Sequence, residues 1–330
     1  MFELHKPSST PVQGSAATEP RSTVWRRVRA ELDRNGALFL LALPGMLLLI
    51  VFKYCTLPYI LIAFKDFRAA DGLWGSKWVG LKNFAFLFGG TGRGGLIVRN
   101  TVLYSLTFMV LGTVLALVVA VLLSKVHKSP VSGVYRLVLF LPRFVSWVII
   151  AYIGYGFLHT KTGMLNGLLA ASGREPVEWY RTPEYWPFIL VASSIWTGLG
   201  SGAIMYLAGI LRINPEYYEA AQIDGANEWQ QAWYITLPSL MPLIIILNLL
   251  ALGNIMRANF GLFYQMPMQY KNPQLIRTTD VIETYVYRAL VSGQLELATA
   301  AGLYQSGVGL VLVVAANWVV RKIDPDRSLF

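Results

Sequence analysis

The stretch Thr101–Leu123, TVLYSLTFMVLGTVLALVVAVLL, carries no charged side chain along its whole length. An α-helix needs about 20 mostly apolar residues to cross the hydrocarbon core of a bilayer. The apolar residues are unbroken here, whereas the strands of a membrane barrel alternate apolar and polar side chains. This stretch therefore predicts a transmembrane helix.

Five other apolar runs of comparable length each contain at most one charged residue. With the first run, the predicted spans are residues 36–64, 101–123, 137–158, 186–211, 237–264 and 297–320. Each reaches or approaches the length that a bilayer requires. We therefore expect an all-α integral membrane protein, with six transmembrane helices between residues 31 and 325.

The composition supports a membrane protein over a soluble one. Of the 330 residues, 55% are hydrophobic and 14% are charged, against about 25% charged in a typical soluble domain. Mean hydropathy is +0.49, and a single cysteine excludes an internal disulfide framework. The net charge of +10 comes from basic residues that flank the apolar runs, so we expect contact with membrane lipid and none with nucleic acid.

The N-terminal segment differs from the rest of the chain. Residues 1–30 are rich in Ser, Thr, Pro and Ala before the first span, and we expect a disordered cytoplasmic tail there. The count of Lys and Arg is nearly equal on the two predicted sides. Arg26, Arg27, Arg29 and Arg34, however, lie close before the first span, which favours a cytoplasmic N-terminus. Six spans then place both termini in the cytoplasm.

The predicted inner connection 212–237, RINPEYYEAAQIDGANEWQQAWYITL, has strong helix signals. Asn214 can cap a helix that Pro215 begins, and Glu216 lies in the first turn, where the helix dipole favours a carboxylate. Gly225 can then turn the chain. We expect a short helix parallel to the membrane, although these signals alone also suit an ordinary connector.

The residue pattern of this connection resembles the EAA signature of permease subunits of binding-protein-dependent ABC importers. Glu219-Ala220-Ala221 is followed by Gly225 and then by Leu237-Pro238 before the fifth span. The resemblance implies a type I ABC importer permease fold, with 212–237 as a cytoplasmic coupling loop seated on an ATPase subunit. The ATPase-coupling residues that it implies are Glu219, Ala220, Ala221, Asp224, Gly225 and Ala226.

Three further stretches resemble the branch of these permeases that serves polysaccharides and complex oligosaccharides. They are 78–84 (WVGLKNF), 141–148 (LPRFVSWV) and 280–287 (DVIETYVY). The branch includes the lipoprotein-linked polysaccharide, aldouronate and alginate importers, and the resemblance covers about residues 35–325. Arg143 departs from the branch, which usually has histidine there. We therefore expect oligo- or polysaccharide cargo, with acidic chains favoured.

Polar and charged groups inside apolar spans are costly unless they face a cavity or a partner. Arginine can bind a carboxylate through two hydrogen bonds, and aromatic side chains suit sugar rings. Asn254 and Arg257 are one turn apart on the expected fifth helix and share a face. Snorkelling of Arg257 and plain packing of the aromatics are the alternatives. The predicted substrate pathway consists of Arg143, Trp147, Tyr152, Tyr155, Asn254 and Arg257.

No catalytic or metal-binding pattern is present. The sequence lacks a G-x-x-x-x-G-K-[ST] phosphate loop, and His5, His127 and His159 are far apart. We therefore expect a non-catalytic subunit without catalytic residues, metal ligands or a cofactor of its own. An ion-coupled secondary transporter or a channel is the alternative function, which the EAA segment argues against.

The resemblance also implies the partners. They are a second homologous permease, with a heterodimer favoured, two cytoplasmic ATPase subunits that bind ATP and Mg, an external solute-binding protein and the carbohydrate itself. The expected location is the bacterial cytoplasmic (inner) membrane, with multiple passes.

Overall fold

The computed structural model describes residues 21–88 and 93–323. The chain divides into two compact units. The first ends at Tyr59, and the second begins at Ile60. The first unit contains α1 (Arg21–Leu49) and the π-helical turn η1 (Ile50–Tyr54). Helix α1 is interrupted at Asn35, which has φ −118° and ψ 18°. The apolar part beyond this break is exposed along its length, as expected for a helix whose solvent is the bilayer.

The prediction of a disordered tail over 1–30 is wrong for residues 21–30, because α1 already begins at Arg21. Strong helix formers such as Arg, Ala, Glu and Leu follow that residue, and they favour a helix before the apolar run starts. Residues 1–20 lie outside the described residues, so the prediction for them stays a prediction.

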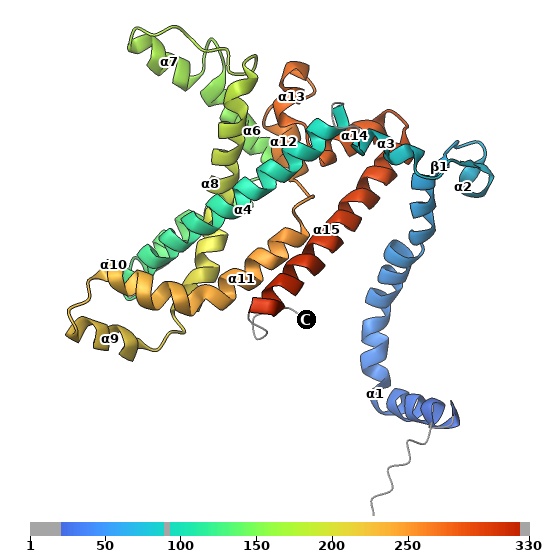
Figure 1. The fold of residues 1–330 in the computed structure, drawn as a ribbon, viewed down its shortest axis with the longest axis horizontal. Coiled ribbons are helices and arrows are strands. Elements are labelled where there is room, and N and C mark those ends of the chain that lie inside the picture. Colours follow the sequence, from blue (N-terminus) through green and yellow to red (C-terminus); the bar gives the residue numbers. More distant parts are fainter. Residues whose placement is uncertain (1–20, 89–92, 324–330) are drawn as a thin grey trace, which may run out of the picture. The chain divides into compact units, whose positions relative to one another are not determined.

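The second unit is mostly helical (Figure 1). The 3₁₀ segment η2 (Leu57–Phe64) leads into it, and a two-stranded antiparallel ribbon pairs Lys65 with Trp78. Its elements are β1 (Lys65–Asp66), α2 (Gly72–Gly75), β2 (Lys77–Trp78), η3 (Lys82–Phe84), α3 (Ala85–Phe88), α4 (Arg93–Lys125), α5 (Ser132–Phe140), η4 (Leu141–Phe144), α6 (Trp147–Leu158), α7 (Met164–Ala171), η5 (Pro183–Tyr185), α8 (Trp186–Ile210), α9 (Pro215–Ile223), α10 (Glu228–Gln231), η6 (Ala232–Thr236), α11 (Leu237–Gly253), α12 (Phe260–Gln265), η7 (Pro273–Leu275), α13 (Ile276–Thr279), α14 (Ile282–Val291) and α15 (Leu295–Ile323).

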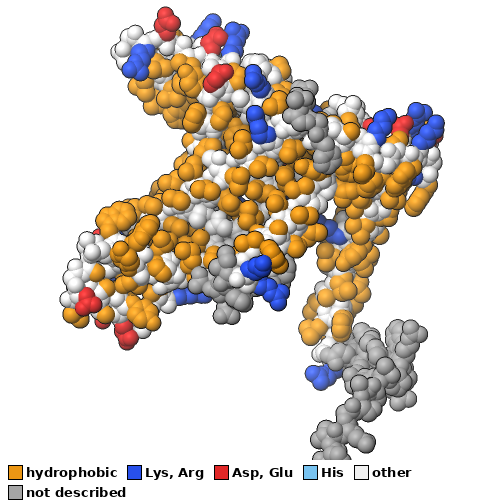
Figure 2. Space-filling view, viewed as in Figure 1, with side chains coloured by type: hydrophobic (Ala, Val, Ile, Leu, Met, Phe, Trp, Pro, Cys, Tyr) orange, Lys and Arg blue, Asp and Glu red, His pale blue; other side chains and the backbone are white. Residues whose placement is uncertain are grey.

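Within the described residues, five helical segments are long and apolar enough to cross a membrane. They are Arg34–Phe64, Gly94–Lys125, Pro183–Ile210, Glu228–Gly253 and Leu295–Lys322. A sixth span results if α5 with η4 and α6 count as one bent element. Figure 2 shows hydrophobic side chains over α4, α8, α11 and α15, with charged side chains gathered over α7 at one end of the second unit and over α9 and α10 at the other.

The predicted span over 137–158 is sharply bent. The chain bends by 97° between Phe144 and Trp147. Pro142 lacks the N–H that a continuing helix would use. Ser146 has extended backbone, and its hydroxyl accepts a hydrogen bond from the backbone N–H of Val148 at 3.3 Å, so that it caps the start of α6.

The predicted span 237–264 is also wrong at both ends. Its helix begins at Glu228, because Asn227 and Gln230 form a capping box there. The helix ends at Gly253, and residues 254–259 form a non-helical connection before α12. The part of the predicted coupling loop 212–237 that follows Asn227 therefore belongs to the membrane helix.

Small residues bring the membrane helices close together. Helix α8 packs along α4 and against α5, and a Cβ atom added at Gly200 would lie 2.1 Å from the carbonyl oxygen of Leu139. A Cβ added at Gly309 of α15 would lie 2.7 Å from the carbonyl oxygen of Gly253 at the end of α11. Close backbone contact of this kind is what stabilises helix pairs in lipid, where burial of apolar surface gives little.

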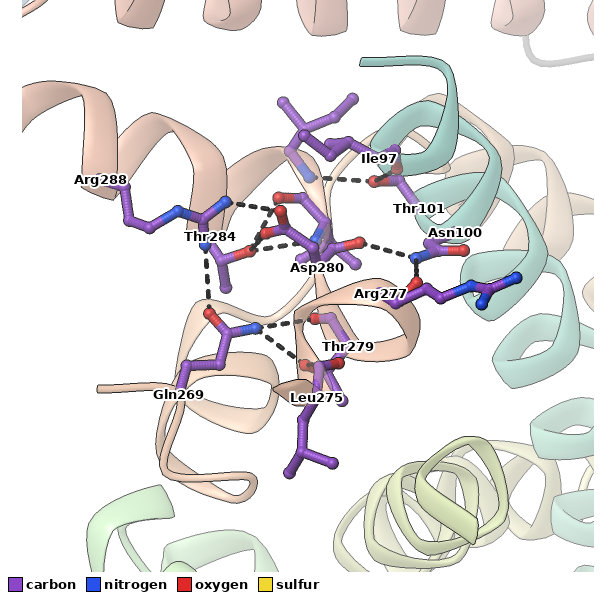
Figure 3. A network of polar contacts seen from close by, with 12 residues as sticks. Ile97, Asn100, Thr101, Gln269, Leu275, Arg277, Thr279, Asp280, Thr284 and Arg288 are labelled. Carbon is purple, nitrogen blue, oxygen red and sulfur yellow. Dashed lines mark hydrogen bonds and ion pairs between the residues drawn. The ribbon is translucent and has the colours of Figure 1, made fainter. Parts of the chain in front are cut away.

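A buried polar network holds the segment between α12 and α15 against α4 (Figure 3). The side chain of Asp280 is 4% exposed and pairs with Arg288, with 2.5 Å between Oδ2 and Nη2. Its Oδ1 accepts a hydrogen bond from the Thr284 hydroxyl at 2.6 Å. From α4, Asn100 donates to the backbone oxygen of Asp280 at 3.1 Å, and the Thr101 hydroxyl accepts from the N–H of Ile282 at 3.0 Å.

This network predicts a large effect for Asp280→Ala. The substitution removes the ion-pair partner of Arg288 and one of the acceptors of the Thr284 hydroxyl. The carboxylate that is lost is buried, and removal of one partner of a buried ion pair costs about 3 kcal/mol. We expect the apparent Tm of the purified transporter in detergent to fall by several degrees. Asp66→Ala is the matched control, since its pair with Arg68 is exposed and such pairs contribute under about 1 kcal/mol. An equal fall of Tm in both variants would contradict this role of the network.

Candidate functional site

Helix α9 carries the predicted ATPase-coupling residues, and both of its ends are capped. The Asn214 side chain accepts a hydrogen bond from the backbone N–H of Glu216 at 3.1 Å. At the other end Gly225 has φ +80°, and the N–H of Ala226 bonds the carbonyl of Ala221 at 2.8 Å while that of Gly225 bonds Gln222 at 3.1 Å. This pair of bonds is a Schellman motif, which requires a left-handed residue at the position of Gly225.

Contacts on three sides tie α9 and α10 to the membrane helices. The hydroxyls of Tyr218 on α9 and Thr236 in η6 lie 2.9 Å apart, and η6 continues directly into α11. The amide of Gln231 donates to the backbone oxygen of Ala226 at 2.9 Å. Lys125, at the end of α4, forms an ion pair with Glu228. Helix α9 is thus joined to the start of α11 through η6, and α10 to the end of α4.

The outer surface of α9 is open. The helix buries none of its residues, and within residues 21–88 and 93–323 no ion pair engages Glu219. Large apolar side chains lie exposed beside it, with Ile223 at 87% and Trp229 at 79%. Exposed apolar side chains beside charged ones are typical of an interaction surface. The EAA pattern alone did not single out Ile223 and Trp229. A large apolar side chain in a polar connection between two spans is, however, a sequence signal that could have indicated them.

The predicted pathway residues do not form one cluster. Arg143 is exposed in η4, before the bend. Trp147 is half-buried against α12, where a Cβ at Gly261 would come within 2.6 Å of its Cδ1 atom, so its contacts are those of packing. Tyr152 and Tyr155 are exposed on α6 and line one cavity of about 290 Å³.

Asn254 and Arg257 lie in the connection between α11 and α12. The expectation that they share a helix face is wrong, because the helix ends at Gly253. The Asn254 side chain donates to the carbonyl of Leu250 at 3.2 Å, and the N–H of Arg257 bonds the carbonyl of Asn254 at 2.8 Å. Both side chains are exposed at this break.

Glu283 on α14 supports this connection, and the sequence did not single it out. Its Oε1 atom accepts hydrogen bonds from the N–H of Ala258 at 2.7 Å and from the amide of Gln305 at 3.0 Å. The same amide donates to the carbonyl of Met256 at 2.7 Å. Burial raises the pKa of Glu283, while the hydrogen bonds and the nearby Arg257 oppose the shift. The connection 254–259 is thus held from both α14 and α15.

A family model described as "Binding-protein-dependent transport system inner membrane component" matches residues 110–326. Protein LplB of Bacillus subtilis is 33% identical over 298 residues, which cover 90% of this chain and 92% of that protein. The polygalacturonan/rhamnogalacturonan transport system permease protein YteP of the same organism is 32% identical over 302 residues, covering 91% and 92%.

Two solved structures share the fold. One is a bacterial ABC transporter involved in the import of the acidic polysaccharide alginate, with a TM-score of 0.80 and 31% identity, covering 90% of this chain and 99% of that one. The other is a bacterial alginate ABC transporter in complex with an alginate pentasaccharide-bound periplasmic protein, with a TM-score of 0.79, 31% identity and coverage of 90% and 98%.

The end of α9 gives a test of its local geometry. Gly225→Ala places a Cβ in the left-handed region, which costs about 1 kcal/mol, although no atom obstructs it. We expect backbone amides over residues 214–227 to exchange with deuterium about fivefold faster. Gly133→Ala, at a site equally free of neighbours but without a positive φ, should leave that exchange unchanged. Unchanged exchange in Gly225→Ala would contradict the Schellman ending.

Proposed function

This chain belongs to the family of binding-protein-dependent transport system inner membrane components, and from that premise we propose what it carries and how it is driven. It is a permease subunit of a sugar or polysaccharide importer, a multi-pass membrane protein with the type I ABC permease fold. Its role is transport rather than chemistry on the cargo, and it works without a bound cofactor.

The coupling step that we propose runs through α9. Helix α9 docks in a groove of a cytoplasmic ATPase subunit, with Glu219 against a basic residue and with Ala220 and Ala221 in close contact. Asp224, Gly225 and Ala226 form the turn beside this contact. The open surface of α9 and the absence of an ion pair for Glu219 within the described chain support this assignment.

The assembly follows from the same premise. Two ATPase subunits bind ATP and Mg, a second homologous permease completes the pathway as a heterodimer, and an external solute-binding protein delivers the sugar. Both termini face the cytoplasm of the bacterial cell, so that α9 and α10 lie inside and α7, α12 and α13 lie outside. The separation of charged ends by an apolar middle in Figure 2 suits a chain that crosses the membrane between these two ends.

The cargo that we propose is an acidic oligo- or polysaccharide. The related structures import alginate, and the related permease YteP is named for polygalacturonan and rhamnogalacturonan; all three polymers carry carboxylates. In this chain Arg143 and Arg257 are exposed, each beside a break in a membrane helix. A permanent cation at such a position attracts a carboxylate and adds little for a neutral sugar.

The mechanism is alternating access. ATP binding closes the two ATPase subunits and moves α9 and α10. The contact of α9 with η6 and the ion pair of Glu228 on α10 with Lys125 of α4 pass the movement to the membrane helices. The pathway then opens outward and accepts sugar, and ATP hydrolysis returns it to the inward-open state. The two states differ in their contacts with the ATPase and the binding protein. Such a difference is required for a ligand to shift the equilibrium between two conformations. The single observation that carries this proposal is the capped, exposed helix α9 joined to α11.

Glu219→Lys tests the coupling proposal. The residue is exposed, so the variant should insert and fold as the wild type does. A lysine opposite a basic groove replaces attraction by repulsion. In the reconstituted complex, we expect the stimulation of ATP hydrolysis by loaded binding protein to fall at least tenfold. Basal hydrolysis by the ATPase subunits should be retained.

Lys128→Glu is the control, because it reverses an exposed charge on the same proposed side of the membrane but outside α9, and it should keep its stimulation. The proposal fails if Glu219→Lys retains normal stimulated hydrolysis, or if both variants lose it equally.

A further inference from the structure

A cavity of about 290 Å³ lies where the end of α6 meets two loop segments, 177–182 and 268–272. Its volume is close to the lower end of ligand pockets, about 300 Å³. The residues that matter in its wall are Tyr152, Tyr155, His159, Tyr180, Lys271 and Asn272. In the proposed orientation all of these segments lie at the outer mouth of the permease.

Tyr180 gives this cavity an unsatisfied donor. The residue is 9% exposed, and its hydroxyl is buried without a hydrogen-bond partner. Burial raises the pKa of Tyr180, and Tyr155 and Tyr270 raise it further, so the phenol keeps its proton and remains a donor. A buried hydroxyl left unpaired destabilises the structure, and a ligand with an acceptor oxygen would remove that cost.

Two other polar groups in the wall, on His159 and Lys271, can donate hydrogen bonds. The Nδ1 atom of His159 accepts from the N–H of Thr162 at 3.2 Å, so the neutral ring carries its proton on Nε2. The ammonium of Lys271 lies 5.5 Å from the ring centre of Tyr270, and Lys271 forms no ion pair within the described part of the chain. No carboxylate is among the residues that line the cavity, so the wall favours an anion.

Aromatic faces complete the wall. The ring centres of Tyr155 and Tyr180 lie 5.7 Å apart, and those of Tyr155 and His159 lie 4.8 Å apart. Tyr152 is 62% exposed at the rim. Tyrosine presents a flat apolar face with a polar end, which suits the apolar faces and hydroxyl edges of a sugar ring.

We propose that this cavity is an outer subsite for one uronate residue of the transported chain. Lys271 binds the carboxylate, the Tyr180 hydroxyl and His159 Nε2–H donate to ring or carboxylate oxygens, and Tyr152 and Tyr155 pack on the sugar. The proposal rests on the proposed function as a sugar importer. It places a first contact at the mouth, apart from the helix breaks that carry Arg143 and Arg257.

Equilibrium dialysis of labelled tetragalacturonate and of its neutral methyl ester tests the subsite, with the permease–ATPase complex in nanodiscs and no binding protein. We expect Lys271→Gln to weaken binding of the acid about tenfold and to leave the ester nearly unchanged, since only the acid offers a charge. Tyr180→Phe keeps the ring but removes the donor, so we expect both ligands to bind about threefold more weakly.

Arg174→Gln is the control, because it removes an exposed cation outside the cavity and should change neither affinity. The subsite is refuted if Lys271→Gln behaves like Arg174→Gln, if it weakens acid and ester equally, or if Tyr180→Phe has no effect. It is also refuted if wild type binds neither probe while the complete system takes up sugar. Failure of uptake and of stimulated ATP hydrolysis in the complete system would instead overturn the proposed function, and the subsite with it.

Discussion

A backbone that crosses a bilayer must satisfy every N–H and C=O group within the protein, because the hydrocarbon core offers no water. This constraint explains the long helices. It also explains why side chains bond the backbone groups that are left free where a helix is interrupted. At the connection 254–259 the side chains of Glu283 and Gln305 bond the freed N–H of Ala258 and the carbonyl of Met256, and Asn259 caps α12. At the bend near residue 145, the hydroxyl of Ser146 does the same for α6.

The same constraint links the two ends of the second unit. Helix α9 contacts η6 through Tyr218 and Thr236, η6 continues into α11, and α11 ends at the connection that Glu283 of α14 supports. Helix α14 is in turn fixed to α4 through Asp280 and its neighbours (Figure 3). A contiguous set of hydrogen bonds and helices thus leads from the proposed ATPase contact, through the connection 254–259, to α14 and α4 at the other end of the unit.

Much of this architecture could be predicted from the sequence, because apolar runs of bilayer length have one stable solution. The membrane class, the type I fold and the sugar importer family are confirmed. The helix limits were harder, since an apolar run does not reveal where a helix stops: Gly253 and Asn254 ended α11 inside the run 237–264. The pathway residues stay predictions. Two of them, Tyr152 and Tyr155, line the cavity around Tyr180, but the sequence does not show that segments about a hundred residues apart meet there.

Uptake of tetragalacturonate into vesicles tests the central claim of ATP-driven import most directly. The chain would be reconstituted with its ATPase subunits and second permease, loaded binding protein would be added outside, and ATP or an ion gradient would be supplied separately. The account predicts uptake with ATP enclosed in the vesicles, including when ionophores have collapsed every ion gradient. Uptake driven by a proton or sodium gradient in the absence of ATP would contradict it.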